Sequence, residues 1–177
     1  MNNHGKIFEQ VFKEDWLKIP NADILRLIDS TSGYKTISNP CDFVGYVFPF
    51  TFYLECKSTQ GNTFPFQRLT QLEKLSKKKD IIGVNAGVII WFIDHKKVCW
   101  VPIEEFIRLK EEGYKSINIK MLNDEKYKII DIPSKEKRVY LESDYSCLIE
   151  WAKNKLKSNI KAKNDIVGQI VDFVDTL

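Results

Sequence analysis

The sequence is poor in the residues that build histidine or cysteine metal sites, with only two histidines and four cysteines in 177 residues. His4 and His95 have no second metal-binding residue at a suitable spacing, and no two cysteines form a Cys-x-x-Cys pair. We therefore expect neither a histidine-based metal centre nor a structural zinc site. Any metal ion bound by this chain should be held by oxygen atoms instead.

Long apolar runs are also missing. A membrane-spanning helix needs about 20 apolar residues, whereas the longest apolar run, residues 84–93, has the length of a strand. No apolar leader precedes a small-residue cleavage site. We expect a cytoplasmic protein with no membrane association, whose cysteines are reduced thiols.

Strong charge of one sign is absent, because the net charge is only +3. A mildly basic chain can bind a polyanion, but the total does not require one, and local clusters matter more. The sequence shows no internal repeat, low-complexity tract or interdomain linker. With 44% hydrophobic residues, a chain of this length can bury a substantial core. We expect a single domain over residues 1–177, with a C-terminal helical segment over about 143–177.

The periodicity of apolar residues predicts a mixed α/β fold. Helical spacing indicates helices over about residues 5–17, 102–112 and 143–157, and a further helix beginning near Pro65 and ending at the lysines 77–79. Alternating or continuous apolar runs predict strands over residues 22–28, 43–48, 52–57, 86–93 and 98–101. Pro49 favours a turn between the second and third strands, which should form an antiparallel hairpin.

One constellation of charged residues lies on that predicted hairpin. Asp42 comes just before one apolar run, and Glu55 and Lys57 lie at the end of the next. Hydrolysis of a phosphodiester requires an activated water and neutralisation of the charge that builds on the phosphate. Mg²⁺ supplies much of this, and it prefers hard oxygen ligands. Two carboxylates that meet across a hairpin are therefore a candidate metal site.

The spacing of Glu55 and Lys57 places both side chains on one face of a strand. Cys56 then points into the core as a small apolar residue, and its backbone carbonyl becomes a candidate third metal ligand. An ammonium group beside the carboxylates can orient the attacking water or stabilise charge on the phosphate. Taken alone, an acid followed by Glu-x-Lys is more often a solvated strand face with a salt bridge.

Longer stretches around these residues resemble the RecU-type Holliday junction resolvases of the PD-(D/E)xK nuclease class. In unbroken order they cover about half of the chain. They are Cys41-Asp42-Phe-Val-Gly-Tyr, Tyr53-Leu-Glu55-Cys-Lys57-Ser-Thr, Thr63-Phe-Pro-Phe-Gln67, Gln71-Leu-Glu-Lys-Leu, Gly87-Val-Ile-Ile-Trp-Phe-Ile, Val98-Cys-Trp-Val-Pro and Gly113-Tyr-Lys-Ser-Ile. The start, Gly5-Lys-Ile-Phe-Glu9, is similar to the family's opening motif.

The resemblance implies a restriction-endonuclease-like core with a mixed central β-sheet flanked by helices. It implies that Asp42 and Glu55 hold Mg²⁺, with Mn²⁺ able to substitute, and that Lys57 is the catalytic lysine. Gln67, at the start of the following helix, would position water or phosphate. Glu9 would be an auxiliary acid; a solvated helix glutamate is the competing interpretation.

The family carries a long basic stalk before the catalytic aspartate. Here only residues 29–40 occupy that interval, with Lys35 as the one basic residue, and His4 replaces the family's arginine before the opening glycine. These departures affect junction specificity and leave the metal and lysine positions intact. The candidate DNA-contacting residues are Arg26, Lys35, Gln71, Lys77 and Lys78, and Arg26 is alternatively a partner of Asp29.

These features predict a Mg²⁺-dependent endonuclease of branched DNA that resolves four-way junctions. A homodimer is expected, because a junction has two equivalent strands to cut and a two-fold dimer presents two equivalent sites. One alternative is a nuclease of the same class that acts on flapped, nicked or linear DNA. Another is a catalytically silent DNA-binding recombination module whose acids are structural.

Overall fold

A computed structural model describes residues 4–28, 39–138 and 140–161 of the chain. Its centre is a six-stranded sheet with the order β1-β2-β3-β5-β6-β8. All neighbouring strands are antiparallel except β3 and β5, so the sheet is mixed, as predicted. The strands are β1 (Ala22–Arg26), β2 (Phe43–Val47), β3 (Phe50–Thr59), β5 (Val84–Phe92), β6 (Lys97–Pro102) and β8 (Ile130–Ile132).

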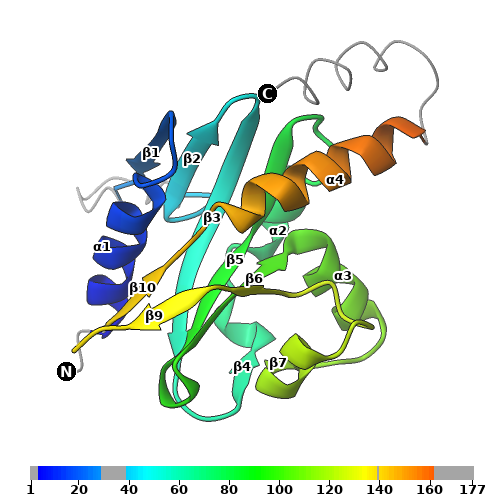
Figure 1. Cartoon of the computed structure of the whole chain (residues 1–177). Helices are drawn as coiled ribbons and strands as arrows, with labels where there is room; N and C mark the ends of the chain where they lie inside the picture. Colours follow the sequence, from blue (N-terminus) through cyan, green and yellow to red (C-terminus); the bar gives the residue numbers. More distant parts are fainter. Residues whose placement is uncertain (1–3, 29–38, 139, 162–177) are drawn as a thin grey trace, which may run out of the picture.

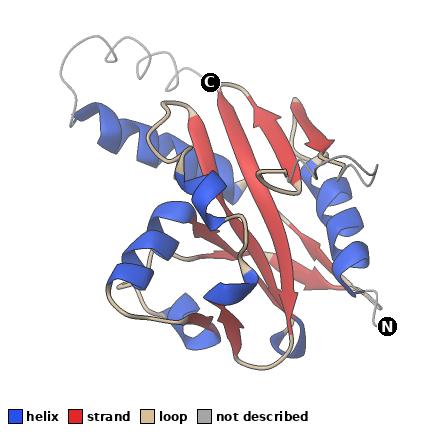
Figure 2. Ribbon diagram, turned by 180° about the vertical axis from the view of Figure 1, so that it is seen from behind, coloured by secondary structure: helices blue, strands red, loops and turns tan. Residues whose placement is uncertain are grey.

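Helices cover both faces of this sheet (Figures 1 and 2). Helices α1 (His4–Trp16) and α4 (Cys147–Lys161) pack on one face, and α2 (Leu72–Ser76) and α3 (Ile103–Glu111) pack on the other. Two small antiparallel sheets complete the fold: β4 (Thr63–Pro65) with β7 (Ser116–Asn118), and β9 (Ser134–Glu136) with β10 (Leu141–Ser143). Three short 3-10 helices are η1 (Phe66–Arg68), η2 (Ile93–His95) and η3 (Ile119–Asn123).

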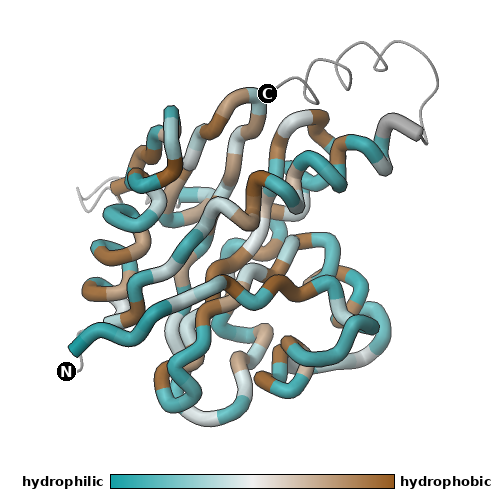
Figure 3. Tube along the Cα trace, in the orientation of Figure 1, coloured by the Kyte–Doolittle hydropathy of each residue, from teal (hydrophilic) through white to brown (hydrophobic). Residues whose placement is uncertain are grey.

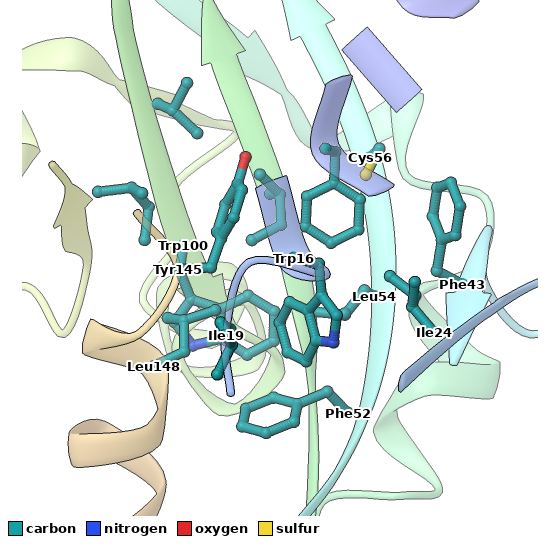
Figure 4. Packing of buried hydrophobic residues seen from close by; sticks show 14 of the residues in the cluster. Trp16, Ile19, Ile24, Phe43, Phe52, Leu54, Cys56, Trp100, Tyr145 and Leu148 are labelled. Carbon is teal, nitrogen blue, oxygen red and sulfur yellow. The ribbon is translucent and has the colours of Figure 1, made fainter. Parts of the chain in front are cut away.

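The core beneath α1 is rich in aromatic side chains (Figure 4). Hydrophilic and hydrophobic residues alternate along α1 (Figure 3), and its buried residues recur at helical spacing. Trp16 packs edge-on against Phe52, with ring centroids 5.2 Å apart. A Cβ atom at position 45 would lie 2.7 Å from the Trp16 ring, so only glycine fits where the indole crosses β2.

The second core lies between the sheet and helices α2 and α3. Strand β5 is buried on both faces, which explains its continuous apolar sequence. Val88 and Ile90 point toward this core, where they join the fully buried Leu109 and the nearly buried Phe106 of α3. Helices α2 and α3 contact β5, and α3 also contacts β6. This core therefore covers the central strands on that face.

Most predicted elements are confirmed with small shifts of their ends, but the helix expected from Pro65 is wrong. Residues 63–65 instead pair as β4 with β7, and the N–H of Phe66 donates to the carbonyl of Lys115. Pairing with a segment about 50 residues away overrides the local helical pattern, which survives only in α2. The expected loop after residue 57 is also shorter, since β3 runs to Thr59. The short strands β4, β7, β8, β9 and β10 were not predicted.

The expected C-terminal helical segment is described only as far as Lys161, so the single-domain prediction for residues 1–177 stays a prediction. Among the described helices, none has both the length and the apolar character needed to cross a membrane.

Candidate active site

The register of the β2–β3 hairpin brings Asp42 and Glu55 together. Phe43 pairs with Leu54, so Asp42, one residue earlier, lies opposite Glu55, one residue later. The backbone N–H of Cys56 donates to Oδ2 of Asp42 over 2.8 Å. This hydrogen bond continues the hairpin past the last paired residues and holds the Asp42 carboxylate against β3.

The side chains of β3 alternate between the two faces of the sheet. Leu54 and Cys56 belong to the core beneath α1, where Figure 4 shows them on the same side as Phe52. Glu55 and Lys57 therefore point to the opposite face. There the Lys57 ammonium donates a hydrogen bond to Oε1 of Glu55. Alternation along the strand thus separates the charged pair from the aromatic core, as the sequence predicts.

Glu55 lies in an electrostatically costly position. Its side chain is fully buried, and within the described part of the chain its Oε2 atom has no hydrogen-bond partner. The pKa of Glu55 is raised to about 7, first by burial and then by the charge of Asp42, while Lys57 acts in the opposite direction. Burial also raises the pKa of Asp42, against the opposing hydrogen bond from Cys56. Two neighbouring carboxylates are therefore held where their charges are poorly compensated.

A divalent cation fits this arrangement. The Cys56 N–H points along the sheet toward Asp42, and in an extended strand the carbonyl of the same residue points to the same edge. Two carboxylates and one carbonyl are hard oxygen donors of the kind that Mg²⁺ prefers. The unpartnered Oε2 of Glu55 is an acceptor that a cation would satisfy. A cluster of three or more His, Cys, Asp or Glu side chains suited to a metal is not found in the described ranges.

Comparison with known proteins identifies the family of the chain. The family model for Recombination protein U, RecU, matches residues 18–160. The chain belongs to the RecU family. This is a family of Holliday junction resolvases, endonucleases that act on branched DNA and generally use divalent metal ions.

The Holliday junction resolvase Hjc from the archaeal hyperthermophile Archaeoglobus fulgidus is a structure similar to this chain, with 17% sequence identity and a TM-score of 0.45. The similarity covers 57% of this chain and 78% of that chain. No curated protein sequence matches the chain.

In this RecU-family chain, α1 and β1 bring two more charged groups toward Asp42. Nη2 of Arg26 lies 2.5 Å from Oε2 of Glu9, and the N–H of Leu27 donates to the Asp42 carbonyl over 2.8 Å. The negative charge of Glu9 contributes to the raised pKa of Asp42, and Arg26 acts in the opposite direction. The structure thus pairs Arg26 with Glu9. The alternative partner, Asp29, lies outside the described residues.

Among the residues that the structure describes, Gln67 has no observed contact with the Asp42 and Glu55 carboxylates. It is an exposed residue of η1 and lines a groove of about 1010 Å³ between η1, α2 and α3. In the described part of the chain, no hydrogen bond joins it to Asp42, Glu55 or Lys57. Its predicted place at the start of a helix was wrong, because β4 and η1 replace that helix.

Three of the remaining candidates for DNA contact, Gln71, Lys77 and Lys78, lie at the two ends of α2. Lys78 lies nearest to the candidate site in the chain of contacts that the structure gives, because its ammonium is 4.9 Å from the centroid of the Tyr53 ring. Tyr53 precedes Glu55 by two residues and so shares its face of β3. Gln71 precedes α2 and accepts a hydrogen bond from Thr70. Lys77 pairs with Glu73 at 3.1 Å, and Lys35 lies outside the described residues.

The sequence interpretation missed Arg68. Its Nη2 donates to the Ser58 carbonyl over 2.8 Å, and its guanidinium carbon lies 5.3 Å from the centroid of the Phe64 ring. Assigning residues 65–79 to one helix concealed this contact, because that assignment gave no reason to place Arg68 beside Ser58 of β3. The available signal was Pro65, which is compatible with an extended segment as well as with a first helical turn.

Proposed function

We propose that this RecU-family endonuclease resolves DNA junctions with Mg²⁺ held by Asp42, Glu55 and the Cys56 carbonyl. The observation that carries the proposal is the buried Glu55 carboxylate, which faces Asp42 and has one oxygen that accepts no hydrogen bond from the residues the structure describes. A purely structural ion pair would be better satisfied, because leaving a buried charged group partly unpaired is costly. A site built to receive a cation explains both features.

When bound, the cation supplies positive charge to the scissile phosphate and lowers the pKa of a water. The protein groups then perform the remaining steps. Lys57 is held beside Glu55 by their hydrogen bond, so its ammonium is oriented before the substrate arrives. It donates hydrogen bonds to the attacking water or to the phosphate oxygens, where negative charge increases during the reaction. Glu9 and Arg26 adjust the charge around Asp42 from the adjacent helix and strand.

The part of the sheet that carries these groups supports access by DNA. The fold places α2 and α3 over β5 and β6, and the catalytic face of β1, β2 and β3 extends beyond them (Figure 2). Leu25 and Tyr46 on that face are 62% and 43% exposed. Leu25 lies on β1, which pairs with β2. Tyr46 lies on β2, which pairs with residues 50–54 of β3, directly before Glu55. Lys78 lies over the same face and would contact a phosphate.

Junction resolution also favours a homodimer, since symmetric incision of the two equivalent strands requires two copies of one site. Sedimentation of the purified protein, alone and with a junction, tests this proposal. A monomer in both conditions, together with paired incisions, would contradict it.

The central experiment compares cleavage of a synthetic four-way junction, a flap, a nicked duplex and a linear duplex in Mg²⁺. We expect paired symmetric nicks in the junction, and loss of those nicks in Lys57→Ala. Lys135→Ala is the matched control. Lys135 is an exposed lysine of β9, and the β9–β10 hairpin packs on the α1 face of the sheet, opposite to the face that carries Lys57. Equal cutting of the linear duplex would refute junction preference. Full activity of Lys57→Ala would refute the proposed site.

Metal binding provides an independent test. Calorimetry with Mn²⁺ and with Mg²⁺ should detect a site in the wild-type protein that is lost in the Asp42→Asn, Glu55→Gln double variant. An unchanged binding isotherm in the double variant would show that the cation binds elsewhere. Absence of binding in the wild type would favour a DNA-binding module with structural acids.

A further inference from the structure

Arg68 is anchored beside the catalytic strand although it is an exposed residue. It ends η1, the short turn that follows β4. One guanidinium nitrogen donates to the Ser58 carbonyl over 2.8 Å, and the group stacks over the fully buried Phe64 ring. The hydrogen bond and the stacking contact hold the guanidinium in one place without burying it. Little conformational entropy is then lost when it binds a ligand.

The anchor places Arg68 at the same strand edge as the proposed metal ligands. Strand β2 pairs with β3 only over residues 50–54, whereas β5 pairs with the opposite edge as far as Thr59. Beyond Leu54, one edge of β3 therefore faces away from β5, and no strand among the described residues pairs with it. The Cys56 N–H points to this edge, because it bonds to Asp42.

The direction of the peptide groups then locates the Arg68 guanidinium. Backbone groups of residues two apart point to the same edge of a strand, so the Ser58 carbonyl lies on the same side as that of Cys56. The two positions are separated by about 7 Å along the strand. Arg68 thus lies next to the proposed cation site along this edge, on the side away from Tyr53 and Lys78.

The charge on Arg68 is available to a ligand. In the ranges that the structure describes, no carboxylate forms a salt bridge with it, whereas Arg26 pairs with Glu9 and Arg108 with Glu105. A guanidinium has five N–H donors, and its planar fork matches two oxygens of a phosphate. One hydrogen bond to Ser58 leaves most of these donors free to contact substrate.

We propose that Arg68 binds a DNA backbone phosphate next to the scissile phosphate and so positions the strand across the catalytic carboxylates. This inference rests on the proposed nuclease function, because that function places a DNA strand at this edge. The anchored guanidinium would act as a fixed phosphate contact on one side of the site. Phosphate contacts set the register of a protein on DNA without reading its sequence.

The test is the salt dependence of junction binding, measured with Ca²⁺ in place of Mg²⁺ and with the DNA confirmed intact afterwards. Each lost phosphate contact lowers the slope of log affinity against log salt by about 0.9. We expect Arg68→Gln to lower the slope by about this amount and to weaken binding about tenfold at ~0.1 M salt. Arg138→Gln is the matched control, because it removes the same charge from an exposed residue between β9 and β10.

A neutral methylphosphonate placed at each phosphate around the cleavage point locates the contact. Wild-type binding should weaken at one position beside the scissile phosphate, and Arg68→Gln should be indifferent at that position. Arg68→Lys keeps the charge and should restore the salt slope while losing part of the affinity. If Arg68→Gln lowers the melting temperature, Arg68→Lys replaces it, and the readout is then its loss of affinity and not its salt slope.

Two results would overturn the inference. One is an unchanged slope and methylphosphonate pattern in Arg68→Gln together with an unchanged affinity in Arg68→Lys, which would make Arg68 a structural brace. The other is equal effects of Arg68→Gln and Arg138→Gln. If the wild type binds junctions but cuts none, the proposed function fails. The salt slope and the methylphosphonate pattern then still decide whether Arg68 contacts a phosphate. If the wild type cuts normally and the slope is unchanged, only this inference fails.

Discussion

Replacing Glu55 by glutamine should stabilise the metal-free protein at high pH while abolishing its activity. The wild-type carboxyl has its pKa raised from 4.5 to about 7, chiefly by burial. A group that holds its proton more tightly in the folded state favours folding most at low pH. The stability of the wild type should therefore fall as pH rises from about 4.5 to 7, and level off above that.

The size of this effect follows from the pKa change. A rise from 4.5 to about 7 corresponds to a loss of about 3 kcal/mol in unfolding free energy once Glu55 is ionised. Glutamine is neutral and so avoids this loss, but it weakens the hydrogen bond from Lys57. We expect a net gain of about 1–3 kcal/mol at pH 8 and little or none at pH 4.5.

Urea unfolding in EDTA, at pH 4.5 and pH 8, measures this difference. Saturating Mg²⁺ should reverse it at pH 8, since the cation binds the folded wild type and has lost a ligand in the variant. Glu73→Gln is the matched control, because the Glu73 side chain is 84% exposed and should show no such pH dependence. A Glu55→Gln variant that is less stable than wild type at pH 8 would refute the reasoning. It would show that the ion pair with Lys57 is structural.

Three further predictions concern chemistry and packing. Lys57→Ala should lower the cleavage rate about 10²–10³-fold in single-turnover assays while junction affinity changes far less, because its role is in the reaction; a parallel loss of affinity would contradict this. Gly45→Ala should cost about 1–3 kcal/mol in urea unfolding, because its Cβ would lie 2.7 Å from the Trp16 ring; a neutral result would show that the indole moves aside freely. Phe106→Ala should cost about 3–5 kcal/mol, because the side chain is almost fully buried between α3 and the sheet; a cost below about 1 kcal/mol would show that the second core collapses around the cavity.

Elements with strong local patterns could be predicted from the sequence. The helix near residues 5–17, the buried strand β5 and the β2–β3 hairpin each carry their own apolar periodicity, and all three are present. The helix from Pro65 was wrong because β4 pairs with β7, whose residues lie about 50 positions later. Strands of three residues, such as β8 and β10, carry too few side chains to show a period.

The candidate site followed the same rule. The sequence predicted that Asp42, Glu55 and Lys57 lie together, because hairpin register and strand alternation are local geometry. The sequence by itself therefore determined which charged residues meet at the β2–β3 hairpin. Only the tertiary structure decided that the Glu55 carboxylate is fully buried, that Glu9 pairs with Arg26, and that Arg68 is anchored at the edge of β3. Burial and contacts of this kind depend on segments that are distant in sequence, and no local pattern encodes where those segments meet.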